Sequence, residues 1–453
     1  MSGLQKEIDE ILEAAMNTKG YGNIPGELFY WITFLTQALP LRSVKTFVEL
    51  LIGAILTPTG FVCATYLQLD MRNHWASYYK WLEKGKWSWV QLAQRFTTLV
   101  LQQHKEAIIH LVIDDTLTLR ASKKAPACQT HHQHGNKPNL AAYVLGQCWV
   151  SLALVMTRPD KQSIAVPLLM RLLPSFGNTG KLIGAKVLMR ALQKPLNTNK
   201  AVRILLDSWY MRATLIQYML EQNYTVIGQV RRDTRLYEVP EQKIKPGRGR
   251  PRQYGKAISW DAVKYTPAKT FTLQLYGKEQ TVHCRARILK ARFLNGYSVK
   301  ALWVQLEDSK QQKRPYRLFL STDTTLSAEE ILLSYAKRWS IESMFHQLKH
   351  HWGMKAMWQQ TRQVLHRWLQ ITQVAYGLTQ LLSTLENRSI EKLASFSPWR
   401  TSPALTAGRI REGLVRELMH VRVSDWWDSK MKIFRPLDSS RHNKNDVKAC
   451  YSG

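Results

Sequence analysis

The spacing of apolar residues changes character along the chain. Up to about residue 105 the apolar positions recur at helical spacing, and prolines at positions 25, 40 and 58 interrupt the pattern. From residue 106 short apolar runs typical of buried strands take over. These runs cover residues 108–113, about 141–157 and 163–172. The pattern predicts a helical N-terminal segment followed by an α/β segment.

The α/β pattern is interrupted and then resumes. A strand at 203–207, a helix at 210–222 and a strand at 224–231 are predicted in alternation. Residues 232–317 are instead basic and rich in strand patterns, at 270–276, 281–288 and 299–306. The strand pattern returns at 317–321. Ser327 and Glu330 then form a capping box before a helix, and an amphipathic helix is predicted at about 361–385.

The chain is therefore expected to be an α/β protein with five segments. They are a helical N-terminal segment, the first part of an α/β core, a β-rich basic insertion, the second part of the core, and a basic C-terminal region. Their boundaries are 1–105, 106–231, 232–317, 318–385 and 386–453. The last segment is expected to serve dimerisation or DNA contacts and to have a poorly ordered end.

Two of the predicted strands end in carboxylates. The run 108–113 is followed by Asp114 and Asp115, and the second run ends in Asp207. Strand ends in α/β sheets are where ligands and metals collect. One aspartate at such a place is ordinary, whereas two indicate a site.

A helical stretch at 335–349 carries a mixed stripe of aromatic, basic and acidic residues. Its members at a spacing of three or four are Tyr335, Arg338, Glu342, Phe345 and Lys349. One interpretation is an ordinary Arg–Glu pair on a solvated helix. The other is an acidic metal ligand flanked by cations that hold a polyanion. In the second case Asp115, Asp207 and Glu342 would supply three oxygen ligands, which suit Mg²⁺ or Mn²⁺ better than zinc.

Charge favours a nucleic-acid partner. The chain has 64 Lys plus Arg against 33 Asp plus Glu, a net charge of +31. Such an excess gives affinity for phosphate backbones without sequence preference. A membrane partner is not expected, because the chain lacks a basic amphipathic anchor, a signal peptide and a spanning segment. Five unclustered cysteines indicate a reducing, cytoplasmic protein.

The motifs together resemble a known family. Tyr335, Arg338, Glu342 and Lys349 have the spacing Tyr-x2-Arg-x3-Glu-x6-Lys. This spacing resembles the YREK signature of the hairpin-forming DDE transposases of bacterial insertion sequences. Asp-Asp-Thr after one strand and Leu-Leu-Asp-Ser-Trp after another resemble that family's two aspartate motifs. The resemblance covers residues 108 to 352.

The resemblance implies a fold and a site. The fold would be an RNase H-like core, a mixed sheet flanked by helices, with a β-rich insertion and a helical N-terminal domain that binds the transposon ends. Asp115 is preferred over Asp114 as the first aspartate because it directly precedes Thr116. An alternating strand also turns neighbouring residues to opposite faces, so only one of the pair should enter the site.

The resemblance also implies an activity. Asp115 would bridge two Mg²⁺ ions, replaceable by Mn²⁺, while Asp207 and Glu342 hold one each. Arg338 and Lys349 would grip phosphates. Tyr335, the remaining signature residue, would contact the same strand. A cytoplasmic, nucleoid-associated bacterial homodimer would cleave the inverted-repeat ends by hydrolysis and transesterification through a hairpin, and join them to target DNA.

The insertion contributes further DNA-binding candidates. Its sequence Lys-Pro-Gly-Arg-Gly-Arg-Pro-Arg places Arg248, Arg250 and Arg252 in a stretch that resembles an AT-hook, which enters a narrow minor groove. A flexible basic loop is the alternative. In relatives an aromatic of the insertion stacks on a flipped base, and Trp260 and Trp303 are the candidates for that contact.

Two other functions remain open from the sequence. The first is an RNase H-like nuclease or resolvase without strand transfer, which would use the same metal site. The second is a DNA-binding protein descended from a transposase, with an inactive site. The helical N-terminal segment and the insertion count against the first, and the intact acidic triad counts against the second.

Overall fold

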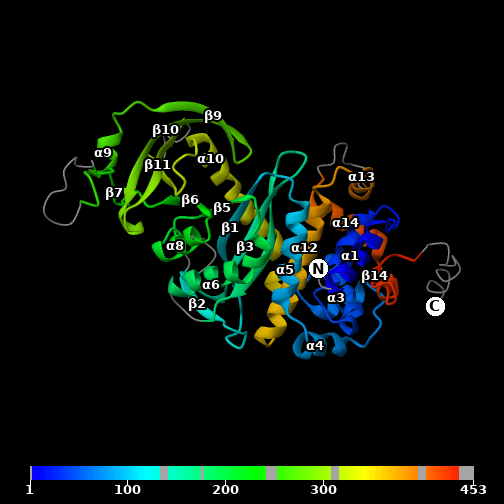
Figure 1. The fold of residues 1–453 in the computed structure, drawn as a ribbon. Helices are drawn as coiled ribbons and strands as arrows, with labels where there is room; N and C mark the ends of the chain where they lie inside the picture. Colours follow the sequence, from blue (N-terminus) through cyan, green and yellow to red (C-terminus); the bar gives the residue numbers. More distant parts are fainter. Residues whose placement is uncertain are drawn as a thin grey trace.

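Twelve of the strands that the structure describes form one mixed sheet through the centre of the protein. The computed structural model describes residues 3–132, 141–174, 178–240, 252–307, 316–395 and 405–437. Strand order in the sheet is β2-β3-β1-β5-β6-β12-β11-β10-β7-β8, with β4 paired to β3 and β9 paired to β10. In Figure 1 the sheet extends from the insertion strands at one end of the molecule to the core strands near its middle.

The core of the sheet consists of β1 (Ile108–Leu119), β3 (Tyr143–Thr157), β4 (Ser163–Leu172), β5 (Ala201–Leu206) and β6 (Thr225–Val230). Strand β3 is antiparallel to β1 and β4, whereas β5 is parallel to β1 and β6. Short β2 (Gln129–His132) pairs with β3 on the side opposite to β1 and its neighbour β5. This mixed α/β sheet is consistent with the RNase H-like core that the resemblance implies.

Strand β1 is longer than predicted. The apolar run suggested an end at Ile113, but antiparallel pairing with β3 continues to Leu119, which lies opposite Gly146. Asp114 and Asp115 are therefore inside β1, opposite Ser151 and Val150. On its other side β1 pairs with β5 only as far as Ile113. The two aspartates thus lie where β1 continues past the end of its parallel neighbour.

Helices cover both faces of the core. Trp149 of β3 meets His366 of α12 (Arg362–Leu382), with ring centroids 5.5 Å apart. The next residue, Val150, approaches Gly184 of α6 (Asn178–Ala191) on the other face. Crossover helix α8 (Ala213–Glu221) packs beside α6, while α11 (Ser340–His350) packs on β4 and β1.

The insertion extends the sheet of the core. Strand β12 (Arg317–Ser321) pairs with β6 on one side and with β11 (Tyr297–Leu306) on the other. Beyond β11 lie β10 (Lys278–Ala291) and β9 (Lys269–Leu275), close to the strands predicted from the sequence at 281–288 and 270–276. The remaining elements of the insertion are β7 (Leu236–Tyr237), β8 (Ala257–Ile258), α9 (Trp260–Val263) and η3 (Arg292–Leu294).

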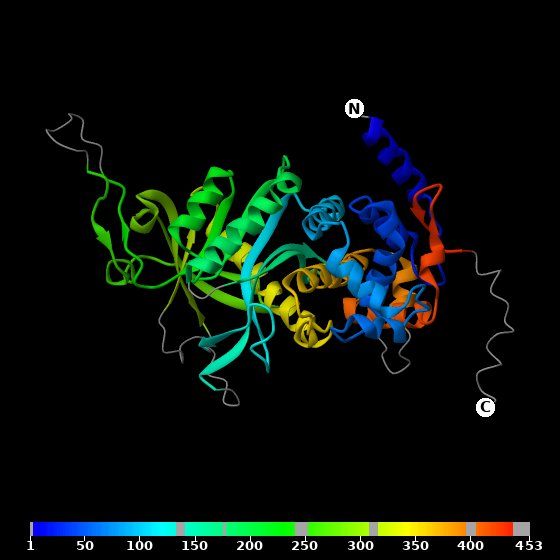
Figure 2. The ribbon, with the colours of Figure 1, turned by 90° about the horizontal axis from the view of Figure 1, so that it is seen from below.

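The N-terminal helices pack together with helices from the end of the chain (Figures 1 and 2). The N-terminal elements are α1 (Gly3–Met16), α2 (Gly26–Thr36), η1 (Leu41–Ser43), α3 (Val44–Leu56), η2 (Val62–Leu67), α4 (Trp75–Lys84) and α5 (Trp89–Gln103). Their partners are α12 and α14 (Ala407–Leu418), which contact α3. Buried Arg367 of α12 donates hydrogen bonds to the carbonyls of Leu82, Gly85 and Trp87 at 2.7, 2.8 and 2.6 Å. The division of the chain into five segments stays a prediction.

The helical stretch that carries the signature is built from three pieces. They are α10 (Ala328–Ala336), the 3₁₀ turn η5 (Lys337–Trp339) and α11. The predicted capping box is present, because the Ser327 hydroxyl accepts a hydrogen bond from the Glu330 amide while the Glu330 carboxylate accepts one from the Ser327 amide. Helix α11 ends at His350, and Gly353 three residues further has a positive φ of 71°.

The short remaining elements are α7 (Gln193–Leu196), η6 (Met354–Ala356), α13 (Arg388–Ala394), η7 (Val423–Trp426), β13 (Trp427–Asp428) and β14 (Ile433–Phe434). Among the helices that the structure describes, none has the length and apolar character needed to cross a membrane.

Candidate active site

The two neighbouring aspartates of β1 have different surroundings. Asp114 accepts a hydrogen bond from the guanidinium of Arg338 at 3.1 Å. Asp115 accepts hydrogen bonds from Lys181 of α6 at 2.8 Å and from the Tyr210 hydroxyl at 3.0 Å. Successive side chains of a strand point to opposite faces. Asp114 therefore faces the signature helix, and Asp115 faces α6.

Asp207 lies next to Asp114 by strand register. Ile113 of β1 is paired with Leu206, the last residue of β5, so a continuation by one residue brings Asp207 beside Asp114. Residues paired across a parallel sheet present their side chains on the same face. The Asp207 carboxylate is held in place by the amides of Trp209 and Tyr210, both at 3.0 Å.

Glu342 reaches this group through Arg338. Its carboxylate is 3.5 Å from the same Arg338 nitrogen that binds Asp114. The Arg338 side chain is 11% exposed and that of Glu342 is 45% exposed. The Nε atom of Arg338 is buried and has no hydrogen-bond partner among the described residues. One guanidinium thus lies between a buried aspartate and a half-exposed glutamate.

The electrostatics of the group reflect crowded carboxylates. Burial, followed by repulsion from Asp207, raises the pKa of Asp114 well above its usual value, although Arg338 opposes the shift. Burial also raises the pKa of Asp207, against the effect of the two amides and Arg338. Buried like charges at this density are unfavourable unless a cation compensates them.

The donor set fits a divalent cation in chemistry but not in its present arrangement. Three carboxylates are the oxygen ligands that Mg²⁺ and Mn²⁺ prefer. Within the described ranges, however, no three His, Cys, Asp or Glu side chains are grouped closely enough to hold one ion. Arg338 lies between Asp114 and Glu342, where it supplies the compensating charge. A cation would have to take its place.

The preference for Asp115 in the sequence analysis stays a prediction. Asp115 contacts Lys181, Tyr210 and Cys148, whose thiol is 3.5 Å from its carboxylate, and its charge also raises the pKa of Asp207. Strand parity turns Asp114, and not Asp115, toward Arg338. Lys181 and Tyr210 carry no motif, and their contact with Asp115 depends on the packing of α6.

The other signature residues occupy different environments. Tyr335 is 6% exposed, and its ring packs against Phe319 at 4.8 Å between centroids. Phe345 is also buried. Lys349 is half-buried on α11. A buried Tyr335 supports the helix from beneath, so a direct contact of its ring with a DNA strand does not agree with its burial.

The DNA-binding candidates of the insertion differ in how far their side chains are buried. Trp303 is 2% exposed in β11, so it belongs to the core and is not available to stack on a base. Trp260 is half-buried and stacks on Tyr316, with centroids 4.3 Å apart. Arg252 is exposed. Arg248 and Arg250 lie outside the described residues.

A cavity of about 590 Å³ opens beside the candidate site. It is lined by Ser208, which follows Asp207, and by Tyr316 and three arginines: Arg231, Arg232 and Arg317. The Arg232 guanidinium lies over the Tyr316 ring at 5.9 Å. Arg231 and Arg232 follow the end of β6 and Arg317 begins β12, and sequence reasoning alone did not single them out, because nothing local distinguishes them from other surface cations.

Comparison with known families agrees with a DDE-type core. Residues 154–378 match the model described as "Transposase DDE domain", and residues 37–178 match the model described as "DDE superfamily endonuclease". The matches support a DDE transposase, a class of nuclease that generally uses divalent metal ions. No curated protein matches the chain.

One solved structure with a weak likeness is a piggyBac transposase synaptic complex with hairpin DNA. It is 12% identical with a TM-score of 0.34, and the alignment covers 68% of this chain and 52% of that one. The chain thus spans about half of the length of that protein. A likeness this weak has no weight for fold or function.

Proposed function

We propose that this protein is a cut-and-paste DNA transposase whose carboxylate triad is Asp114, Asp207 and Glu342. The observation that carries the proposal is that Arg338 contacts Asp114 of β1 and Glu342 of α11, while the charge of Asp207 at the end of β5 acts on both Arg338 and Asp114. Two of the three have a raised pKa because burial and neighbouring carboxylates disfavour their charge. Such an acidic cluster in a chain of net charge +31 suits a cation and a polyanion together.

The triad would hold divalent cations, with Mg²⁺ as the proposed ion and Mn²⁺ as a substitute. Bound there, they would supply an activated water and stabilise the departing 3′-oxygen of a phosphodiester. Arg338 compensates the carboxylates without the ion and would turn to a DNA phosphate once the ion is bound. Its unpartnered Nε provides a further donor for that contact. Half-buried Lys349, on the same helix, is proposed to contact phosphate as well.

The cavity beside Asp207 is proposed to receive a nucleotide of the cleaved strand. A volume of about 590 Å³ is in the range of small-ligand sites. Arg231, Arg232 and Arg317 would bind its phosphates, and Tyr316 presents an aromatic face. Trp260 stacks on that same tyrosine. Of the two tryptophans considered, Trp260 and Trp303, it is therefore the one suited to base stacking.

The remaining steps follow from the resemblance and are part of the proposal. The protein would act as a homodimer on the inverted-repeat ends of its own element. It would nick each end, pass through a DNA hairpin, and join the freed 3′-OH ends to target DNA. Localisation to the bacterial nucleoid belongs to the same proposal.

The test compares the two neighbouring aspartates. Linear DNA that carries the terminal sequences flanking the coding region is incubated with Mg²⁺ and wild-type protein or one of four variants. Asp114→Asn, Asp207→Asn and Glu342→Gln are each expected to lower single-turnover cleavage by at least ~100-fold with end binding retained. Asp115→Asn is the matched control, with the same chemical change one residue away, and it should retain most of the activity.

Two outcomes would contradict the proposal. If Asp115→Asn abolished cleavage while Asp114→Asn did not, the triad would contain the other aspartate. If wild-type protein bound the ends but cleaved no DNA with Mg²⁺ or Mn²⁺, the protein would not be an active transposase.

A further inference from the structure

The face of the sheet beneath the signature helix carries two polar rows of opposite character. In the first row His110 of β1 is paired with Arg203 of β5. In the second row Asp114 lies beside Asp207, one residue beyond the last pair of the two strands. Apolar Val112 and Leu205, which are paired with each other, separate the rows. Because the rows are four residues apart along β1, they share one face.

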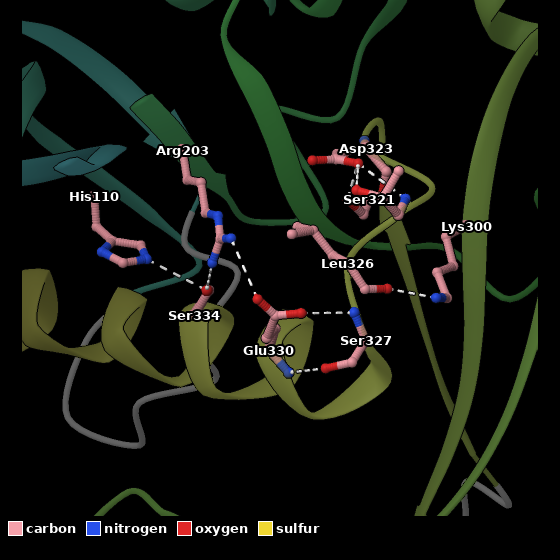
Figure 3. A network of polar contacts seen from close by, with 10 residues as sticks. His110, Arg203, Lys300, Ser321, Asp323, Leu326, Ser327, Glu330 and Ser334 are labelled. Carbon is pink, nitrogen blue, oxygen red and sulfur yellow. Dashed lines mark hydrogen bonds and ion pairs between the residues drawn. The ribbon is translucent and has the colours of Figure 1, made fainter. Parts of the chain in front are cut away.

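The helical stretch above the sheet carries a matching series at every fourth position: Glu330, Ser334, Arg338 and Glu342. Its first half meets the first row. Arg203 donates a hydrogen bond to the Ser334 hydroxyl at 3.1 Å and lies 3.6 Å from the Glu330 carboxylate. The His110 Nε2 atom is 3.3 Å from the same hydroxyl. Figure 3 shows Arg203 and His110 converging on Ser334 from the sheet.

The second half of the series meets the second row, where Arg338 binds Asp114 and lies beside Glu342. The signs of the charges therefore alternate in a complementary way. A basic row on the sheet faces Glu330, and an acidic row on the sheet faces Arg338. Burial lowers the pKa of His110 to about 3, so this ring is neutral and Arg203 provides the positive charge of its row.

A shift of the helix along its axis would break this match. One helical turn is about 5.4 Å long and moves each residue to the place of its fourth neighbour. A shift in one direction would bring Arg338 against Arg203, and a shift in the other would bring Ser334 against the buried Asp114. Either shift would leave a buried charge without its partner, which costs several kcal/mol. The complementary rows thus define one axial position.

We propose that Arg203 is a positioning residue that sets the register of α10 and α11 on the sheet, so that Glu342 reaches Asp114 and Asp207. The inference rests on the proposed function, because it assigns a purpose to the placement of that triad. Arg203 itself lies at the far row and touches none of the three carboxylates by any contact described above. Its side chain is 11% exposed, whereas that of Glu330 is 51% exposed, so the hydrogen bond to Ser334 is the better shielded of its two contacts with the helix.

The start of the helix is held independently. Lys300 of β11 donates a hydrogen bond to the carbonyl of Leu326, and the capping box ties Glu330 to Ser327 (Figure 3). Asp323, in the loop between β12 and α10, accepts from the amide of Thr325 at 2.9 Å. Because these contacts hold the N-terminal end of α10, loss of Arg203 should loosen the turns that follow, up to α11, without unfolding the helix.

The experiment uses the full-length protein with four changes. Arg203→Ala removes the contact, and Arg203→Lys keeps the charge without the planar fork. Ser334→Ala removes the hydroxyl that accepts the hydrogen bond of Arg203, so it tests the same contact from the helix side. Arg158→Ala is the matched control, because Arg158 is also buried and paired, with Asp160 at 2.5 Å, in the turn between β3 and β4.

Three readouts are taken: end binding, single-turnover cleavage, and hydrogen–deuterium exchange of residues 335–349 without DNA or metal. Arg203→Ala should bind ends normally but cleave about 100-fold more slowly, since a misplacement of about 1 Å can cost that much. Exchange in residues 335–349 should be faster. Arg203→Lys should recover part of the cleavage rate and Ser334→Ala should lose part of it, whereas Arg158→Ala should change none of the three readouts.

Normal cleavage together with normal exchange in Arg203→Ala would overturn the inference. An equal loss of cleavage in Arg158→Ala would also overturn it, because the effect would then come from general destabilisation. If the wild-type protein cleaves no DNA, the proposed function fails, and the exchange data alone decide whether Arg203 holds the helix.

Discussion

Replacement of Arg338 by alanine removes the cation that lies between two carboxylates of the candidate site. The guanidinium is 3.1 Å from Asp114 and 3.5 Å from Glu342. Without it, Asp114 would face Asp207 and Glu342 with no compensating charge. The change should therefore destabilise the protein in a way that a bound divalent cation can reverse.

The magnitude follows from the burial of each pair. Side chains of Arg338 and Asp114 are 11% and 13% exposed, and removal of one partner of a buried pair costs about 3–5 kcal/mol. Glu342 is 45% exposed, so its contact adds at most about 1 kcal/mol. Protonation of Asp114 offers a partial escape, because its pKa is already raised. A loss of about 3 kcal/mol at pH 7.5 is expected.

The loss should depend on pH with a defined sign. A carboxyl whose pKa is higher in the folded state than in the unfolded state destabilises the fold once it ionises. The stability that this carboxyl contributes is fully present below its pKa in the unfolded state and is lost as pH rises through its pKa in the folded state. Removal of Arg338 raises the pKa of Asp114 further, so the difference between variant and wild type should grow from pH 5 to pH 8.

Urea unfolding and thermal melting with and without Mn²⁺ test this reasoning. A cation at about 100 times its Kd adds about 2.7 kcal/mol, which should recover most of the loss in Arg338→Ala. Lys337→Ala is the control, because Lys337 pairs with Glu106 at 2.8 Å with 24% and 30% exposure and should cost no more than about 1 kcal/mol. A loss in Arg338→Ala no larger than in this control, or no greater recovery by Mn²⁺ than in the wild type, would refute the assignment.

Four further outcomes are expected. Burial lowers the pKa of His110 to about 3 in the folded state, so the free energy of unfolding should decrease as pH falls below about 6.5, the pKa of an unfolded histidine. At pH 5 the His110→Gln variant, which lacks this titration, should regain about 2 kcal/mol of that loss in urea unfolding. Trp303→Ala should cost about 3–5 kcal/mol of stability, whereas Trp260→Ala should lower DNA affinity by about 1–3 kcal/mol with little change in melting temperature. If about ten phosphates are neutralised, the logarithm of the DNA association constant should fall against log salt with a slope near roughly −9, and a slope near about −2 would place most of the charge elsewhere. Burial and Asp115 raise the pKa of Cys148 to about 12, so alkylation of this thiol at pH 8 should require unfolding.

Local pattern was enough to predict most elements of the core. The apolar run before Asp114 and the run before Asp207 are buried strands, and the capping box begins α10 as its two side chains predict. These features depend on residues close in the chain, where periodicity and hydrogen bonding between neighbours decide the structure. The composition likewise determined the strong positive charge. The neighbouring positions of the two strands that carry the aspartates were also predictable, because strand ends in α/β sheets meet at one edge.

Tertiary structure alone decided which residues of those elements face each other. Local sequence favoured Asp115 through the Thr that follows it, whereas the pairing of β1 with β5 and the packing of α11 turn Asp114 toward Arg338 and Asp115 toward α6. Burial of Trp303 depends in the same way on strands far along the chain. The physical reason is that successive side chains of a strand point to opposite faces of the sheet. A shift of one residue in the pairing with a distant strand therefore moves every buried side chain to the other face. Sequence by itself determined the elements and their chemistry, whereas the contacts between distant elements determined the geometry of the site.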